Sequence, residues 1–252
     1  TEERGFVDGA DERVRIEAPS IVVGGGTGIE GADGTDQDTS DDLAEGDTYP
    51  LGVQIVSSGL IQLIAPDGID IRRASELLVR HDNSLIDLAA EFVDILGSLY
   101  AGANPGRDIP GEPTGLTWAG ENASVTIEAD DMVTLGGDDT ATDLDVVNGL
   151  ASAEGATITR GGSIQATGLV QVTVSGGTDP FFFLNEQSFI KTDAQAVPDF
   201  TPGAASAVEI MTDDGILIVG AIQALDPASD VTLVSGTGLL EIRGFVETGD
   251  QL

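Results

Sequence analysis

The chain has no cysteine, one histidine and one lysine among its 252 residues. Without cysteine it can form neither a disulfide framework nor a thiolate metal site. A multi-histidine zinc site is excluded, and a Ser-His-Asp triad would have to use His81. His81 lies among Arg80, Asp82 and Asn83, which is typical of a solvated surface. The sequence therefore predicts that the protein is not an enzyme.

Aromatic residues and long apolar runs are also scarce. Aromatics make up 4% of the chain against 40% hydrophobic residues, so the core must consist of Val, Ile, Leu and Ala. No window of about 18 apolar residues occurs, which predicts no membrane insertion. Residues 1–11 are polar and acidic and lack the pattern of a secretory signal. If residue 1 is the natural start, we therefore expect synthesis in the cytoplasm without classical export.

Acidic residues dominate the charge. There are 44 Asp and Glu against 10 Lys and Arg, a formal net charge of −34. Such self-repulsion destabilises a compact state in ordinary salt, but in molar salt the Debye length falls to about 3 Å. We therefore expect a source that lives in high salt. The same charge makes nucleic acid and anionic membranes poor partners.

Two short phrases recur along the chain. An alternating apolar phrase occupies 14–18, 125–129 and 208–212, and a Gly-Leu phrase occupies 57–63, 166–172 and 236–242. The separation of Val14 from Gly59 is close to that of Val125 from Gly168, whereas the third copy is shorter. Recurrence of this kind indicates one β unit repeated three times with different insertions.

This repetition sets the predicted fold class. We expect a mainly β protein of three related antiparallel β modules, barrel-like or sandwich-like, with one inserted α-helix and long acidic loops. Asp213-Asp214-Gly215 has the composition of a hairpin turn. The predicted divisions are an N-terminal arm (1–12), module 1 (13–122, with an acidic loop at 24–49), module 2 (123–205) and module 3 (206–252), with one compact domain as the alternative.

Residues 74–101 are predicted to form the inserted helix. Apolar residues there recur at helical spacing, and Gly102 follows as a helix stop. The residues on the predicted apolar stripe are Leu78, Leu85, Leu88, Ala89, Phe92, Leu96 and Leu99.

Cofactor and metal motifs are weak. Residues 26–31 match Gly-x-Gly-x-x-Gly, but acids rather than a helix follow, so no dinucleotide site is predicted and no cofactor is expected. Within the acidic loop, carboxylates at alternate positions resemble a calcium loop, although Asp41 replaces the bend glycine. Ca²⁺ or another hard cation is the candidate ligand there, and a solvated loop is the alternative. The candidate ligands are Asp36, Asp38, Asp42 and Asp47.

Two clusters are candidates for contact with a neighbouring subunit. Phe181, Phe182 and Phe183 are the only aromatic cluster, and because three consecutive residues cannot share one strand face, they are either covered on both faces or reach a neighbour. The basic cluster of Arg72, Arg73 and Arg80 could pair with carboxylates of an adjacent copy.

The sequence thus favours a structural subunit of a large self-assembling complex from a halophilic source. A virion component, such as a capsid or tail-tube protein made in the cytoplasm of the host, is the leading form. Its partners would be further copies of itself and other structural proteins of the assembly, with no nucleic acid. The alternative is a cell-surface or extracellular adhesion or carbohydrate-binding module whose acidic loops hold cations.

Overall fold

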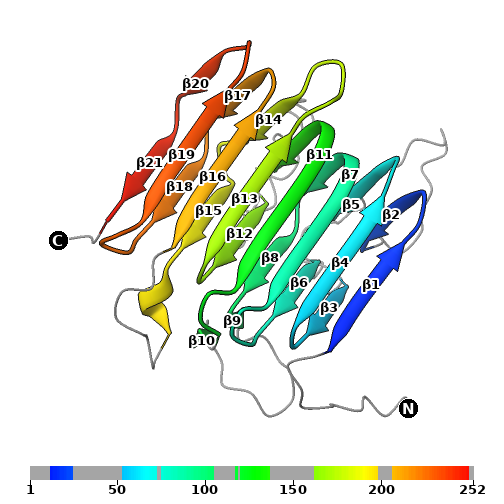
Figure 1. The fold of residues 1–252 in the computed structure, drawn as a ribbon, viewed down its shortest axis with the longest axis vertical. Helices are drawn as coiled ribbons and strands as arrows, with labels where there is room; N and C mark the ends of the chain where they lie inside the picture. Colours follow the sequence, from blue (N-terminus) through cyan, green and yellow to red (C-terminus); the bar gives the residue numbers. More distant parts are fainter. Residues whose placement is uncertain are drawn as a thin grey trace, which may run out of the picture.

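The protein is a stack of parallel β coils. The computed structural model describes residues 12–24, 53–72, 75–104, 117–118, 120–136, 162–197 and 206–249. Each coil contains three strand segments, and each segment pairs with the corresponding segments of the coils before and after it. Seven coils follow one another from the blue to the red end of the chain (Figure 1). The architecture is a parallel β-solenoid.

The first and second segments of the coils share one 12-stranded sheet, and the third segments form a 7-stranded sheet. The first segments are β1 (Arg13–Glu17), β4 (Leu60–Ala65), β7 (Leu85–Ile95), β11 (Ser124–Leu135), β13 (Leu169–Val174), β16 (Ala207–Thr212) and β19 (Asp230–Ser235). The second segments are β2 (Ser20–Val23), β5 (Gly68–Ile71), the later halves of β7 and β11, β14 (Phe181–Leu184), β17 (Gly215–Ile218) and β20 (Leu240–Ile242). The third segments are β3 (Gln54–Ser57), β6 (Glu76–Val79), β8 (Ser98–Ala101), β12 (Ser163–Ala166), β15 (Phe189–Thr192), β18 (Ala221–Ala224) and β21 (Phe245–Thr248).

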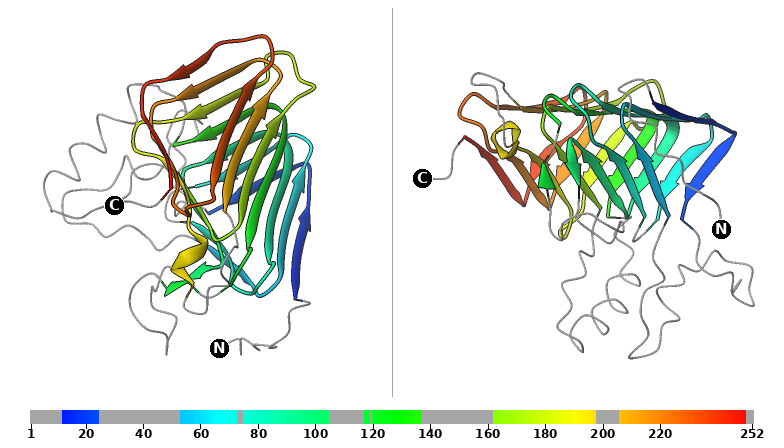
Figure 2. Two further views of the ribbon diagram at one scale, coloured as in Figure 1. Left: turned by 60° about the vertical axis from the view of Figure 1, so that its left-hand side comes forward. Right: turned by 90° about the horizontal axis from the view of Figure 1, so that it is seen from below.

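The core lies between the two sheets, which run together along the stack (Figure 2). Side chains alternate between the two faces of a strand, so every second residue points into the core. In-register pairing then places equivalent residues directly above one another. One such ladder consists of Val14, Ile61, Ile86, Val125, Val170, Val208 and Val231. Branched aliphatic side chains suit this pleated, stacked surface, which explains a core with few aromatics.

The prediction of antiparallel modules is wrong. Among the described strands only the short pair β9 (Ala103–Asn104) and β10 (Thr117–Trp118) is antiparallel. Asp213 and Asp214 do not form a hairpin turn, because β17 pairs with β14 and β20 rather than with the preceding β16. A two-residue turn between apolar strands looks the same in sequence whether it reverses the chain or bends it into the next segment of one coil.

The predicted helix over residues 74–101 is also wrong. The described part of this range contains β6, β7 and β8. Ile86 and Leu88 are fully buried, whereas Leu85 is half-buried and Phe92 points outward. The helical spacing of leucines coincided with a strand pattern carried by β-branched residues in the intervening positions. No described helix is long and apolar enough to cross a bilayer.

Seven coils therefore replace three modules as the unit of repetition. The shortest coils are roughly 23–25 residues long, as the pairing of Leu60 with Leu85 and of Ala207 with Asp230 shows. The three copies of the alternating phrase lie in β1, β11 and β16, which are all first segments. The Gly-Leu phrase leads into β4 and β13 in its first two copies, but into the second segment β20 in its third.

Two long stretches that lie outside the described residues, 25–52 and 137–161, follow the same corner of a coil in the chain. Gly24 ends the second segment of coil 1 and Gly136 ends that of coil 4, and both have positive φ, +99° and +93°. A Cβ at Gly24 would overlap Ser75 Oγ, and one at Gly136 would overlap Ser188 Oγ. Both glycines are thus required by backbone conformation and by space. These stretches, and others between coils, hide the short period from a sequence reading.

Candidate self-association surface

The triple phenylalanine divides between core and surface. All three residues lie on β14, where Phe182 is fully buried in the core ladder. Phe183 is also buried, at 8% exposure, although it lies on the opposite face of the strand from Phe182. Phe181 is half-buried and pairs in register with Met132 of β11 and Gly215 of β17. Beyond Met132 the same outer row continues to Phe92, which is 39% exposed. The structure thus assigns Phe182 to the core and adds Phe92 and Met132 to the outer apolar row.

The predicted arginine cluster is not one surface. Arg72 follows β5, and its Nε lies 3.0 Å from Oδ2 of Asp70 in the same coil. Arg80 follows β6 at the opposite end of that coil's third segment, and it also has partners. Arg73 lies outside the described residues. Since Phe181 belongs to coil 5, the structure does not bring the aromatic and basic candidates together.

The candidate cation ligands Asp36, Asp38, Asp42 and Asp47 all lie outside the described residues. Within the described ranges no group of three or more His, Asp or Glu side chains is arranged to hold a metal ion.

Outward-facing side chains follow a charge rule along the coils. In-register stacking brings equivalent side chains about 4.8 Å apart, where two carboxylates would repel each other. The strands instead place glutamine beside a carboxylate, and the amide donates to it. Four such pairs occur: Gln62 to Asp87 (2.7 Å), Gln171 to Glu209 (3.2 Å), Gln54 to Glu76 (2.7 Å) and Gln223 to Glu247 (3.1 Å).

Asp70 and Asp94 are the exception. Among the described strand pairs they are the one place where two carboxylates stand directly opposite each other. Each is compensated, because Asp70 pairs with Arg72 and Asp94 accepts a hydrogen bond from the Thr134 hydroxyl on the next coil. Among the described strand pairs of a chain with 44 acids, direct stacking of two carboxylates is thus limited to this one pair.

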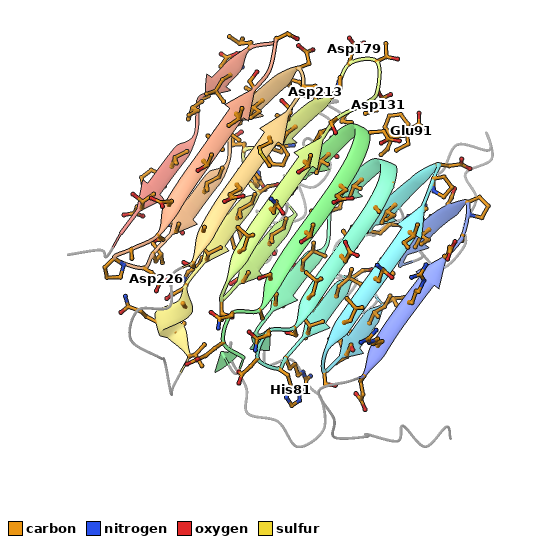
Figure 3. The ribbon with its side chains drawn as sticks, in the orientation of Figure 1. His81, Glu91, Asp131, Asp179, Asp213 and Asp226 are labelled. Atoms are coloured by element: carbon orange, nitrogen blue, oxygen red, sulfur yellow. The ribbon has the colours of Figure 1, made fainter. Side chains whose placement is uncertain are left out.

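The acids gather at corners instead. Glu91, Asp131, Asp179 and Asp213 lie along one edge of the molecule, where the first segment of a coil bends into the second (Figure 3). His81 and Asp226 lie at the opposite edge. Carboxylates at a solvated corner keep their water and can diverge from their neighbours, which lowers their mutual repulsion.

A buried carboxylate fixes the corner between coils 5 and 6. Asp226 accepts hydrogen bonds from the backbone N–H groups of Ala194 (2.9 Å) and Gln195 (3.1 Å), and from the Ser206 hydroxyl. The first two belong to the single turn of 3₁₀ helix at Ala194–Ala196. Burial raises the pKa of the neighbouring Asp193; the charge of Asp226 raises it further, while Lys191 opposes the shift. These hydrogen bonds hold the end of coil 5 and the start of coil 6 in place.

The last coil leaves its inward-facing residues partly uncovered. Leu240 and Ile242 of β20 continue core ladders, yet they are 42% and 48% exposed. Val231, Leu233 and Val246 of the same coil are only partly buried. Equivalent residues one coil earlier, such as Ile216 and Ile218, are fully buried. The described part of the chain thus places no further layer over coil 7.

The first coil also leaves inward-facing residues partly uncovered, although fewer of them are exposed than in coil 7. Ile16 of β1 continues the ladder of Leu63 but is 37% exposed, and Val14 and Ile55 are partly buried. Ile21 and Val23 of β2 are buried. Each end also presents unpaired edges, since β1, β2 and β3 have described partners on one side only, as do β19, β20 and β21. An exposed strand edge is a template for pairing with another chain.

These end coils are the surface that the sequence reading missed. The signal that could have revealed them is the coil period, because only after the coils are counted can the end strands of the described stack be recognised. Residues 12–24 and 230–249 appeared as ordinary half-buried strands.

No protein-family model matches the chain, and comparisons with curated proteins and with solved structures give no match.

Proposed function

We propose that the protein is a structural, self-associating subunit rather than a catalyst. The observation that carries this proposal is that the described residues leave both end coils of the stack partly uncovered. Coil 7 exposes Leu240 and Ile242, and coil 1 exposes Ile16, together with unpaired strand edges. Repeat proteins of this type need polar capping layers at their ends if they are to remain soluble monomers.

The charge distribution supports a high-salt setting for this assembly. Copies with a net charge of −34 repel each other strongly at low ionic strength, and molar salt shortens the range of that repulsion to about 3 Å. Association is therefore expected to strengthen as salt is added. A virion component of a virus that infects a halophilic host, assembled in the host cytoplasm with other structural proteins, is the form we propose.

The test is static light scattering with electron microscopy of the purified protein, first in molar KCl and again after dialysis to low salt. The proposal predicts ordered oligomers, tubes or filaments in high salt that dissociate on dialysis. A folded monomer at both salt concentrations and at high protein concentration would contradict it.

One observation favours a second candidate, a carbohydrate-binding or adhesion module at a cell surface. The outer row of Phe92, Met132 and Phe181 forms an apolar strip on a flat sheet, and Glu91 and Asp131 lie beside its first two members. Exposed apolar patches of this kind mark interaction sites. Titration calorimetry with neutral oligosaccharides tests it: Phe92→Ala should abolish binding, whereas Thr173→Ala, also an outward residue, should leave binding unchanged.

A further inference from the structure

The two ends of the solenoid are complementary to each other, and this complementarity defines how copies would meet. We propose that copies stack head to tail, with β19 of one copy pairing in parallel with β1 of the next, so that Asp230 faces Arg13 of the next copy. The inference rests on the proposed function, because it specifies the geometry of that self-association.

The first argument comes from the core ladders. Within the molecule, Val208 pairs with Val231, and Val14 pairs with Ile61. Adding a copy in the same register places Val231 against Val14 and continues the ladder without a gap. The other inward-facing pairs are equally matched: Leu233 with Ile16, Leu240 with Ile21, Ile242 with Val23, Val246 with Ile55, and Thr248 with Ser57.

The second argument comes from charge. Arg13 is exposed on β1 and Asp230 is exposed on β19, and neither side chain has a hydrogen bond or ion pair with any described residue. The proposed register makes them directly opposed neighbours of opposite sign. Only 10 basic residues serve the whole chain, yet two of them, Arg13 and Arg15, are on this one edge strand.

The third argument is that the junction obeys the charge rule of the interior rows. Each outward carboxylate of coil 7 would face an uncharged or basic residue of the next copy: Asp230 faces Arg13, Glu241 faces Val22, and Glu247 faces Val56. Glu17 of β1 would face Val234. No two carboxylates of these described strands would be opposed across the junction.

A two-fold arrangement of two N-terminal ends fits less well. Antiparallel pairing of β1 with itself about Arg15 would oppose Arg15 to Arg15 while placing Arg13 opposite Glu17, so charge alone does not decide against it. It would, however, reverse the strand direction and break the parallel core ladders of the stack. The head-to-tail contact is heterologous, so it repeats and gives a filament rather than a closed dimer. Seven coils at the strand spacing of about 4.8 Å give an axial repeat of about 34 Å for each copy.

Charge reversal at the two ends tests this register. The variants are Arg13→Asp and Asp230→Arg, each checked for folding by circular dichroism, with Glu128→Arg on the middle coil as the control for a changed net charge. Association is measured by light scattering at the lowest KCl concentration at which the unaltered protein still associates. Each end variant alone should weaken association by at least about tenfold, since like charges then meet at the junction. Glu128→Arg should leave association within about threefold of the unaltered protein.

Mixing gives the sharper result. Arg13→Asp carries acids at both ends and Asp230→Arg carries arginines at both ends, so a 1:1 mixture should form alternating stacks under conditions in which each variant alone associates weakly. The double variant should also recover association. If the unaltered protein associates but the single variants associate equally well, or the mixture does not recover, the proposed register is wrong while self-association stands. If the unaltered protein does not associate at any salt concentration, the proposed function itself fails. If Arg13→Asp loses association while Asp230→Arg associates like the unaltered protein, the contact joins two N-terminal ends and the head-to-tail arrangement is overturned.

Discussion

Replacing two adjacent residues of β7 separates the strand structure from the helical interpretation of the same segment. Ile86 is fully buried in the core ladder between Ile61 and Val125, whereas Leu85 is half-buried and faces outward. The helical pattern predicted the reverse, with Leu85 on the apolar stripe and Ile86 off it. The strand structure and the helical interpretation therefore predict opposite answers to the question of which alanine variant, Leu85→Ala or Ile86→Ala, loses more stability.

The magnitude follows from burial. Ile86→Ala removes three carbons, worth about 0.8 kcal/mol each in transfer free energy, and leaves a closed cavity that adds about 1 kcal/mol or more. The expected loss of unfolding free energy is about 3–4 kcal/mol. Leu85→Ala removes as many carbons from a site that opens to solvent, so its loss is about 1 kcal/mol.

Urea unfolding in 2 M KCl, followed by far-ultraviolet circular dichroism, measures both values. The midpoints are comparable if the slope of free energy against urea is unchanged. Because Ile86 lies in coil 3 and contacts coils on both sides, its effect should be seen in the main transition and not only in fraying of one end. A larger loss for Leu85→Ala than for Ile86→Ala would refute the strand assignment of β7.

Three further predictions follow from the corners and the outer rows. Gly136 has a φ of +93°, and a Cβ there would overlap Ser188 Oγ, so Gly136→Ala should lower the free energy of unfolding by about 2 kcal/mol or more, measured by thermal or urea unfolding. Gly249→Ala is the control: φ is +89° but nothing lies within 4 Å, so only the backbone penalty of about 1 kcal/mol is expected. Equal losses for the two variants would show that the corner at Gly136 is not tightly packed. Asp193→Asn keeps the oxygen that accepts a hydrogen bond from the Ala196 N–H but removes a carboxylate whose pKa is raised by burial, so the variant should be more stable than the unaltered protein at pH 7. This difference in stability should shrink as the pH falls below the raised pKa, because the native carboxyl group then becomes protonated. A pH series in which the melting temperatures of the two proteins do not converge would contradict this. Gln171→Glu places a carboxylate opposite Glu209 and should destabilise the protein by roughly 0.5–1 kcal/mol at 0.1 M KCl but not at molar KCl. Thr126→Glu, in the same row between Asp87 and Gln171, is a positive control because it also creates an opposed pair of carboxylates, with Asp87. A destabilisation that is independent of salt would mean that its cause is not electrostatic.

The β character of the chain could be predicted because strand alternation is local. Val14, Ile16 and their equivalents alternate with polar residues in a way that needs no knowledge of the partner strand. Strand direction could not be predicted, because the partner of each strand lies one coil away and the intervening insertions make that distance irregular. Leu60 pairs with Leu85, for example, but Val14 pairs with Ile61 across a much longer stretch.

The helix error has a similar origin. A period of 3.6 residues was satisfied by Leu85, Leu88, Phe92 and Leu99. A period of 2 was satisfied separately in the two halves of β7, by Ile86 with Leu88 and by Val93 with Ile95. Two patterns were superimposed, and β-branched residues at the second set were the better guide. A β7 strand of 11 residues is long enough to imitate a helix of three turns.

The candidate surface was accessible to sequence reasoning only in part. That Phe182 belongs to the core was one of the two outcomes considered for the phenylalanine cluster, and the structure shows it fully buried. The open ends could not be recognised, because exposure at Ile16, Leu240 and Ile242 depends on where the stack begins and ends. That information lies in the three-dimensional order of the coils.

The most direct test of the account is electron microscopy of the protein in molar KCl with measurement of the axial repeat. The stacked-coil account predicts filaments in which strands lie across the axis, with a repeat of about 34 Å for each copy and a strand spacing of about 4.8 Å. Monomers only, or assemblies in which the solenoid axes lie side by side and both ends stay open, would contradict the claim that the open ends of the coil stack drive assembly.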